Sequence, residues 1–247
     1  MMKQPYYLAY EKRYKTVFEA GVHHWGHAPD DAVLYETLKN WVHANDLKGK
    51  SIIEFACGEG ACGVILSELG CKYHGVDISP TVVQKAKEAL RDYKDATVDV
   101  FDMVIDTVTE KYDAALDCMG FHMLVTDNDR NTYLKNAYNA LRVGAPMLFF
   151  RQSYRNENNM QAVYKGVVHS FDEWKAISGT DYDTPILRRT NMGNGDLEVL
   201  IPLVPARAND KDGYIEEMEK AGFVVEEFME MEESNAILYS ASIFVRK

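Results

Sequence analysis

The sequence predicts one α/β domain in which helices cover a mostly parallel sheet. Two observations predict this fold class. Short apolar runs alternate with helical stretches of about ten to fifteen residues, which is the pattern of successive strand–helix–strand units. Glycine or an acidic residue also stands at the end of each of the first four runs. The 247 residues, 47% of them hydrophobic, are enough to bury one large core.

The charge balance argues against several classes of partner. The formal net charge is −11, and a surface this acidic repels phosphate backbones and anionic lipids, so we expect neither nucleic acid nor a membrane as a partner. Residues 1–13 contain no apolar signal segment, which favours a cytoplasmic location. The cysteines show no zinc-type pairing and are expected to be small buried hydrophobes: Cys57, Cys62, Cys71 and Cys118.

The first fifty residues predict two helices. Tyr7, Tyr10, Tyr14 and Phe18 recur at helical spacing and form an aromatic stripe. A loop rich in ring residues follows, over 23–29, and either Asp30 or Asp31 can cap the second helix. The expected buried face of that helix is Leu34, Leu38, Trp41 and Val42.

The next hundred residues carry the alternating pattern. We expect strands over 51–55, 72–76, 97–101, 112–116 and 146–150, and helices over 61–69, 80–90 and 129–141. Ligands of such sheets bind at the carboxyl ends of the strands. In this sequence those ends carry Glu54 with a glycine loop, Asp77, Asp102 and Asp117. This agreement predicts a binding site at that edge.

The remaining residues predict an insertion and a closing unit. Residues 151–210 exceed an ordinary connection between a strand and a helix, and ordered insertions of this length are usually functional. Within them, residues 170–173 form a capping-box pattern, and 186–190 and 197–203 flank a turn-rich segment, which suggests a hairpin. A helix over 213–221 and strands over 223–229 and 237–245 complete the chain.

The glycine loop has more than one interpretation. Gly58-x-Gly60-x-x-Gly63 fits a dinucleotide loop and other adenosyl-binding loops, and it can also be a turn without a ligand. Glu54 precedes it within an apolar run. A buried carboxylate needs a cation or several donors, so Glu54 indicates either an ammonium-bearing ligand or an acceptor of N–H groups.

Two further acids suit an adenosyl group. Asp77 ends the second strand, where an acid would bind two ribose hydroxyls of either an adenosyl ligand or NAD. Asp102 suits the adenine amine, with Ile78 and Met103 as walls for the ring, although it can also be a loop cap.

These residues resemble class I S-adenosylmethionine-dependent methyltransferases. Residues 52–60 resemble motif I of that family, 75–79 its acidic motif after the second strand, and 102–103 and 112–117 its third- and fourth-strand motifs. The resemblance covers about residues 50–150. Ala56 is a departure, because many members have glycine there, and we expect a slightly tighter loop with binding retained.

The resemblance implies a Rossmann-like three-layer sandwich with a mostly parallel seven-stranded sheet, a C-terminal antiparallel hairpin, an N-terminal helical cap and a long insertion after strand 5. The expected single domain comprises a cap (1–50), a cofactor-binding core (51–150), a substrate-side insertion (151–210) and the final helix and hairpin (211–247). The cofactor would be S-adenosylmethionine and the product S-adenosylhomocysteine. The implied contacts are Glu54, Ala56, Gly58 and Gly60 at the methionyl end, Asp77 on the ribose, Asp102 near adenine, and Asp117 and Cys118 bordering the methionyl end.

The methyl acceptor is harder to predict than the cofactor. His122 follows the fourth strand and is our candidate base, although it can equally be a packing residue. Tyr7, Tyr10 and Tyr14 with Trp25 form either a lid or part of the core, and Arg151 with Tyr154 borders the site, where Arg151 would bind an anionic acceptor group or pair with a surface acid.

We expect no metal at His23, His24 and His27, and a small-molecule acceptor bound by a monomer or homodimer. The competing interpretations are an NAD(P)-dependent oxidoreductase and a non-catalytic S-adenosylmethionine-binding module.

Overall fold

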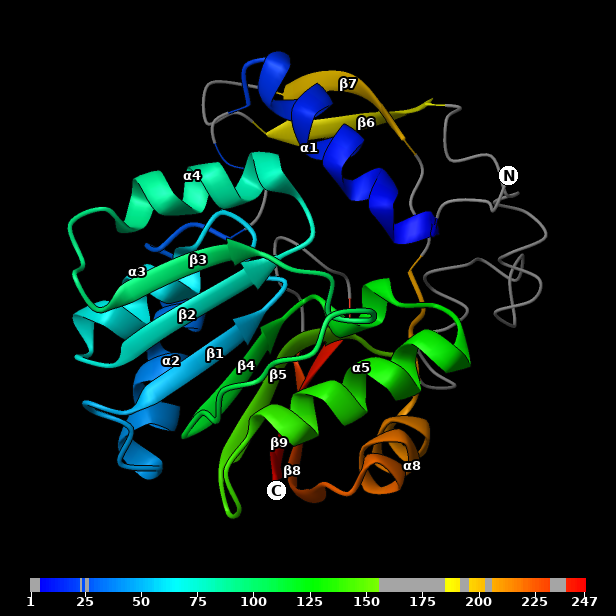
Figure 1. Cartoon of the computed structure of the whole chain (residues 1–247). Coiled ribbons are helices and arrows are strands. Elements are labelled where there is room, and N and C mark those ends of the chain that lie inside the picture. Colours follow the sequence, from blue (N-terminus) through cyan, green and yellow to red (C-terminus); the bar gives the residue numbers. More distant parts are fainter. Residues whose placement is uncertain are drawn as a thin grey trace.

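The chain folds around one twisted sheet (Figure 1). The computed structural model describes residues 5–22, 24, 27–155, 185–191, 196–202, 206–231 and 239–247. Seven of the described strands form the sheet, in the order β3-β2-β1-β4-β5-β9-β8. In that order their bounds are Ala96–Val100, Lys72–Asp77, Ser51–Phe55, Ala114–Cys118, Pro146–Ser153, Ser240–Arg246 and Val224–Met231. The first five are parallel, while β9 is antiparallel to both β5 and β8. The expected mostly parallel sheet with a C-terminal antiparallel pair is confirmed.

Helices cover both faces of this sheet and give the predicted three layers (Figure 1). Helices α5 (Asp127–Ala140) and α8 (Lys211–Ala221) pack on one face, where Tyr133 and Met218 join the core. Helices α2 (Ala32–Ala44), α3 (Ala61–Glu68) and α4 (Pro80–Leu90) supply the core of the other face. The predicted buried face of α2 is confirmed: Leu34, Leu38, Trp41 and Val42.

The helix starts follow the residue types that favour them. Asp31 caps α2 by accepting the backbone N–H of Leu34, and Ser79 caps α4, whose first residue is Pro80. Each cap fixes the residue at which the preceding loop ends and the helix begins. The loop between β2 and α4 therefore lies at the carboxyl edge of the sheet.

Strand β5 is longer than the sequence predicted. It continues from Phe150 to Ser153, through an irregularity in its pairing with β9 between Phe149 and Gln152. Arg151 lies in this bulge with φ 52°, a left-handed conformation that bends the strand. Arg151 is thus a strand residue, and the expected strand end at residue 150 is wrong.

The insertion contains the predicted hairpin. Strands β6 (Pro185–Asn191) and β7 (Asp196–Pro202) pair antiparallel, and β7 lies beside the N-terminal helix α1 (Ala9–Glu19), as Figure 1 also shows. The predicted capping box at 170–173 lies outside the described residues. The N-terminal cap is thereby extended by a segment from the second half of the chain.

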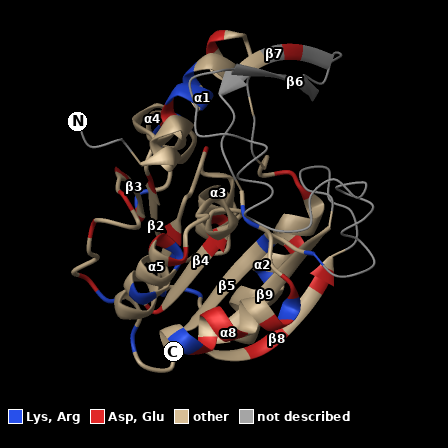
Figure 2. Cartoon of the chain, turned by 90° about the vertical axis from the view of Figure 1, so that its right-hand side faces the viewer, with Lys and Arg blue, Asp and Glu red and all other residues tan. Residues whose placement is uncertain are grey.

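The outer strand β8 carries several acidic side chains (Figure 2). Glu226, Glu227 and Glu230 lie along it, and its pairing with β9 is interrupted between Val225 and Glu227. Charges and bulges on an edge strand discourage pairing with another chain. Within the described residues, no helix is both long and apolar enough to cross a bilayer.

Candidate cofactor site

The carboxyl ends of β1 and β4 mark the candidate site. From β1 the sheet continues to β2 and β3 on one side, and from β4 to β5 on the other, so the strand order changes direction between them. A crevice at such a point is the usual ligand site of an open α/β sheet. Three non-glycine residues here have left-handed backbones: Ala56 (φ 54°) directly after β1, Met119 (φ 64°) directly after β4 and Arg151 (φ 52°) in the bulge of β5. Such backbone strain gathers at functional sites.

Ala56 replaces the usual first glycine of the loop, and a glycine opposite accommodates its methyl group. A Cβ built on Gly120 would lie only 2.6 Å from the Cβ of Ala56. The loop after β4 therefore has to contribute a glycine because the loop after β1 has an alanine.

Gly63, the third glycine of the motif, lies inside α3 and leaves room for the ring of Tyr73. A Cβ on Gly63 would lie 2.5 Å from the ring of Tyr73, whose hydroxyl donates a hydrogen bond to Glu54 at 2.5 Å. Glu54 is 1% exposed, and burial raises its pKa well above the usual value. Its partners in the structure are the Tyr73 hydroxyl and the Cys62 thiol, so donors within the protein already offset its burial. The sequence had left this alternative open, although it named N–H rather than O–H and S–H donors.

Asp77 lies at the end of β2, directly beside the glycine loop. Its two carboxylate oxygens accept the backbone N–H of Gly58 at 3.0 Å and that of Ser79 at 2.9 Å. Burial outweighs these hydrogen bonds and raises the pKa of Asp77 to about 6. The backbone N–H of Ile78 also contacts this carboxylate, and the predicted ribose contact remains a prediction.

Asp102 caps its own loop. Its side chain accepts the backbone N–H groups of Val104 and Ile105, at 2.9 and 3.2 Å, and it also contacts the Tyr7 hydroxyl. The predicted adenine contact remains a prediction. Ile78 and Met103, its expected walls, are both partly buried against the core on the α5 face.

Asp117 is the second buried acid of the crevice, and it accepts four hydrogen bonds from the protein. It accepts hydrogen bonds from the backbone of Gly120 and Phe121, from the Tyr133 hydroxyl at 2.6 Å and from the Gln152 amide at 2.9 Å. These bonds hold the loop that follows β4. Asp117 therefore shapes the border of the crevice, and its predicted contact with the methionyl end remains a prediction.

Cys118 follows Asp117 as the last residue of β4. It is only half-buried, whereas Cys57, Cys62 and Cys71 are buried, so the expectation that all four cysteines are buried hydrophobes is wrong for Cys118. Its predicted place beside the methionyl end remains a prediction.

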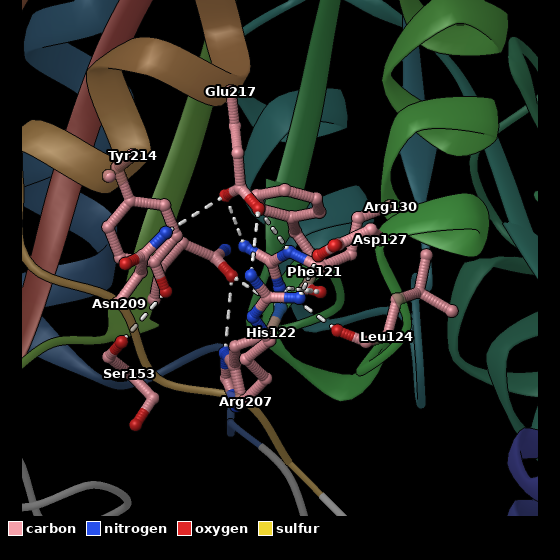
Figure 3. A network of polar contacts seen from close by, with 12 residues as sticks. Phe121, His122, Leu124, Asp127, Arg130, Ser153, Arg207, Asn209, Tyr214 and Glu217 are labelled. Carbon is pink, nitrogen blue, oxygen red and sulfur yellow. Dashed lines mark hydrogen bonds and ion pairs between the residues drawn. The ribbon is translucent and has the colours of Figure 1, made fainter. Parts of the chain in front are cut away.

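His122 is part of a buried polar network rather than an exposed base (Figure 3). It is 2% exposed, and its Nδ1 lies 3.1 Å from the Gln152 side-chain oxygen. Burial lowers the pKa of His122 to about 4, so the ring is neutral near pH 7. This environment matches the packing role that the sequence had offered as the alternative to catalysis.

Arg151 pairs with an acid of the N-terminal cap. Its guanidinium contacts both carboxylate oxygens of Asp31, at 2.5 and 3.2 Å, and the Nδ1 atom of His27 at 2.8 Å. The side chain is 3% exposed. Of the two roles left open for Arg151, the structure shows the ion pair, which ties the start of α2 to the crevice.

The other predicted residues are dispersed. The Tyr154 hydroxyl donates to Glu230 and the ring packs on Phe228, so Tyr154 points toward β8 and away from the crevice. His24 contacts Glu59 at 3.2 Å, while His27 lies beside Arg151, so these two side chains have different partners. Trp25 and His23 lie outside the described residues.

Helix α1, which carries most of the aromatic stripe, lies across the carboxyl edge of the sheet (Figure 1). Tyr7, in the short helix η1 (Tyr6–Leu8), contacts Asp102, and the Tyr10 hydroxyl lies 2.6 Å from the sulfur of Met123. The Tyr14 hydroxyl lies 3.7 Å from the position that a Cβ of Gly58 would take. Tyr7 is part of the core on the α5 face and Tyr10 packs against that core, while Tyr14 reaches the glycine loop, so the stripe has contacts of both kinds.

Known proteins resemble this chain in sequence and in fold. The sequence profile of a methyltransferase domain matches residues 53–147. The fold resembles an S-adenosylmethionine-dependent methyltransferase from Clostridium acetobutylicum, with a TM-score of 0.63 and 15% identity, over 97% of this chain and 98% of that one. Residues 53–147 therefore match a methyltransferase domain, and the chain has the fold of a protein that depends on S-adenosylmethionine. That cofactor is the one that the strand-end acids had indicated.

Other relatives of this methyltransferase differ in what they methylate. The fold also resembles the 1,6-didemethyltoxoflavin-N1-methyltransferase of Burkholderia thailandensis with bound S-adenosylhomocysteine, with a TM-score of 0.64 and 13% identity, over 98% of this chain and 88% of that one. The sequence is 39% identical over 49 residues to the ribosomal protein L11 methyltransferase of Photobacterium profundum, which is 19% of this chain and only 17% of that protein.

Sequence reasoning missed several residues that shape the site of the methyltransferase. Tyr73 and Gln152 hold the two buried acids, and Glu11 fastens the lid. The Glu11 carboxylate accepts hydrogen bonds from the Ser79 hydroxyl at 2.6 Å and from the Thr81 hydroxyl at 2.7 Å and backbone N–H at 3.1 Å. Burial raises the pKa of Glu11, but these bonds and Lys15 outweigh it and lower the pKa to about 2. The helical spacing of Glu11 gave no sign of this contact.

Replacing Glu11 with alanine should loosen the lid of the methyltransferase. The loss of charged hydrogen bonds at the start of α4 removes about 1.5–3 kcal/mol of attachment, so S-adenosylhomocysteine should dissociate on the order of tenfold faster. Stopped-flow fluorescence would measure this rate. Glu19→Ala removes the same charge from an exposed position of the same helix and should leave the rate unchanged. Equal dissociation from both variants would contradict a fastening role for Glu11.

Proposed function

We propose that this methyltransferase transfers the S-adenosylmethionine methyl group to a small molecule enclosed beneath α1. The observation that carries the proposal is the covered crevice: η1 and α1 contact Asp102, Met123 and α4 in turn. A protein or RNA acceptor would have to displace this cover. The net charge of −11 further disfavours nucleic acid and membranes, and we propose a monomer or homodimer as the working form.

The residues present fit the cofactor chemically. Asp77 offers its carboxylate at the loop, where it would repel the diphosphate of NAD(P) and suits a cationic ligand. When bound, S-adenosylmethionine supplies a methyl group already activated by its sulfonium. Asp77 would hold the ribose, and the backbone of Gly58 and Gly60 would border the methionyl end.

The protein then contributes geometry and the exclusion of water rather than a complex acid–base apparatus. Methyl transfer is an in-line displacement, which is favoured by a fixed approach and a desolvated acceptor. Tyr10 and Tyr14 exclude solvent from above, while Ala56 and Met119 hold their strained loops below. His122 is neutral and buried, so its role in this proposal is structural. The acceptor then either binds without its proton or loses the proton to water.

The acceptor class can be tested by following the methyl label. The full chain would be incubated with methyl-labelled S-adenosylmethionine and either a panel of small thiols, amines, phenols and carboxylates or isolated ribosomal proteins. We expect label in a small molecule and formation of S-adenosylhomocysteine. Label in ribosomal proteins alone would support a protein acceptor, in line with the short similarity to the L11 methyltransferases. Cofactor binding without turnover in any arm would support a non-catalytic module.

A further inference from the structure

One side of helix α1 contacts the glycine loop and α4. Glu11, Tyr14 and Phe18 follow one another at steps of three and four residues, so they lie on the same side of α1. Glu11 binds the start of α4, and the Tyr14 hydroxyl approaches Gly58. The rings of Tyr14 and Phe18 stack, with their centres 5.8 Å apart. The second half of α1 therefore lies against the part of the crevice that follows β1 and β2.

Lys85, in the second turn of α4, contacts both α1 and the glycine loop. Its ammonium nitrogen lies 4.0 Å from the centre of the Phe18 ring, within the range of a cation–π interaction. The same nitrogen lies 4.0 Å from a carboxylate oxygen of Glu59. Glu59 stands between the first two glycines of the loop, Gly58 and Gly60. One cation therefore links the helix that covers the crevice to the loop beneath it.

Glu59 depends on such partners because its carboxylate is buried. Its side chain is only 5% exposed, and a buried carboxylate is costly unless a cation or several donors accompany it. His24, in the loop that follows α1, contacts the same carboxylate oxygen, with its Nδ1 at a distance of 3.2 Å. Movement of the N-terminal cap away from the glycine loop would therefore remove a partner of this buried acid.

These four residues form what we call the clasp: Phe18 and His24 from the N-terminal cap, and Glu59 and Lys85 from the cofactor-binding core. A cation–π contact and an ion pair are both stronger when water is excluded. Water that enters between the cap and the glycine loop weakens both contacts together, so the clasp opens as a unit. Because it consists of protein groups alone, it closes the crevice before and after the cofactor binds.

We propose that Lys85 is a positioning residue that holds α1 on the glycine loop and thereby limits how fast the cofactor enters and leaves the crevice. The ring of Phe18 and the carboxylate of Glu59 are its two anchors. The inference rests on the cover that α1 forms in the proposed function. Its test uses the cofactor product alone, so the finding of a protein acceptor would not decide it.

Binding kinetics of the full chain distinguish a clasp from a direct cofactor contact. Lys85→Met removes the charge and keeps most of the length of the side chain. We expect the association and dissociation rates of S-adenosylhomocysteine, measured by stopped-flow fluorescence, to rise together by about fivefold each, so that the dissociation constant changes little. Lys87→Met removes the same charge from an exposed position of the same helix and should leave both rates unchanged.

A second variant tests the other anchor of Lys85. Phe18→Leu keeps an apolar side chain and removes the ring, so it should also speed up both rates. In the double variant with Lys85→Met it should add little, because the two changes break the same contact. Three results would overturn the proposal. They are unchanged rates in Lys85→Met despite a lower stability in urea, a rise in the dissociation rate alone, and effects of the two substitutions that multiply in the double variant.

Discussion

Replacing Asp77 with alanine should abolish most of the stabilisation that S-adenosylhomocysteine gives the protein. A ligand at a hundred times its dissociation constant stabilises the wild type by about 2.7 kcal/mol. Two charge-assisted hydrogen bonds to ribose hydroxyls contribute about 3–6 kcal/mol, so their loss weakens binding by at least about a hundredfold. At the same ligand concentration the variant would then gain only about 0.4 kcal/mol. Thermal unfolding with and without ligand measures both values.

Asp77→Ala also affects the stability of the ligand-free protein, and the measurement must separate this effect from the loss of ligand binding. Asp77 also accepts the backbone N–H groups of Gly58 and Ser79, so its removal destabilises the ligand-free protein as well. The informative quantity is therefore the shift produced by the ligand rather than the melting temperature itself. A variant that responds to S-adenosylhomocysteine as strongly as the wild type does would rule out the ribose contact.

The same carboxylate predicts how cofactor binding depends on pH. Burial raises the pKa of Asp77 to about 6, so it takes up a proton as the pH falls through that value. A protonated carboxyl accepts fewer hydrogen bonds, and bound ribose favours the ionised form, so the affinity falls about tenfold for each pH unit well below 6. Asp77→Asn binds weakly and lacks this dependence, which makes it the control.

Residues at the ends of strands could be predicted because their signal is local. The alternation of apolar runs and helices gives the parallel sheet, and the carboxyl ends of parallel strands meet at one edge whatever the details of packing. Asp77 and the loop at Gly58 and Gly60 follow from this rule alone. Caps such as Asp31 and Ser79 are equally local, because they bond to a backbone N–H three residues away.

The partners of the buried charges could not be predicted, because they come from distant parts of the chain. Tyr73 reaches Glu54 across 19 residues, and Arg151 reaches Asp31 across 120. No periodicity in the sequence reports such a contact. This is why Glu54 suggested a cationic ligand when a tyrosine of the next strand already meets it, and why Arg151 remained a candidate anion site.

The insertion shows a different limit. Turn residues and flanking β-branched segments located the hairpin at β6 and β7 to within a residue or two. Its place beside α1 depends on how the whole N-terminal cap packs, which local pattern does not encode. The lid assignment of Tyr7, Tyr10 and Tyr14 likewise needed the fold, since an aromatic stripe at helical spacing fits a core equally well.

The network around Arg130 predicts the largest loss of stability (Figure 3). Arg130 is fully buried, and its guanidinium bonds to both carboxylate oxygens of Glu217, at 2.7 and 2.6 Å, and to the backbone oxygens of Phe121 and Leu124. Glu217→Ala leaves that charge buried without its counterion. Breaking a buried pair in this way costs about 3–5 kcal/mol of the free energy of unfolding. Urea unfolding followed by circular dichroism would measure the loss.

The chain contains a matched control for this prediction. Arg246 and Glu226 form the same two-bond pair, at 2.5 and 3.0 Å, but both side chains are more than a third exposed. Water solvates whichever charge remains, so Glu226→Ala should cost less than about 1 kcal/mol. Equal losses at Glu217 and Glu226 would contradict the argument, because burial is the main difference between the pairs. A large loss at Glu217 alone would show that Arg130 holds the loop after β4, on which His122 and the border of the crevice depend.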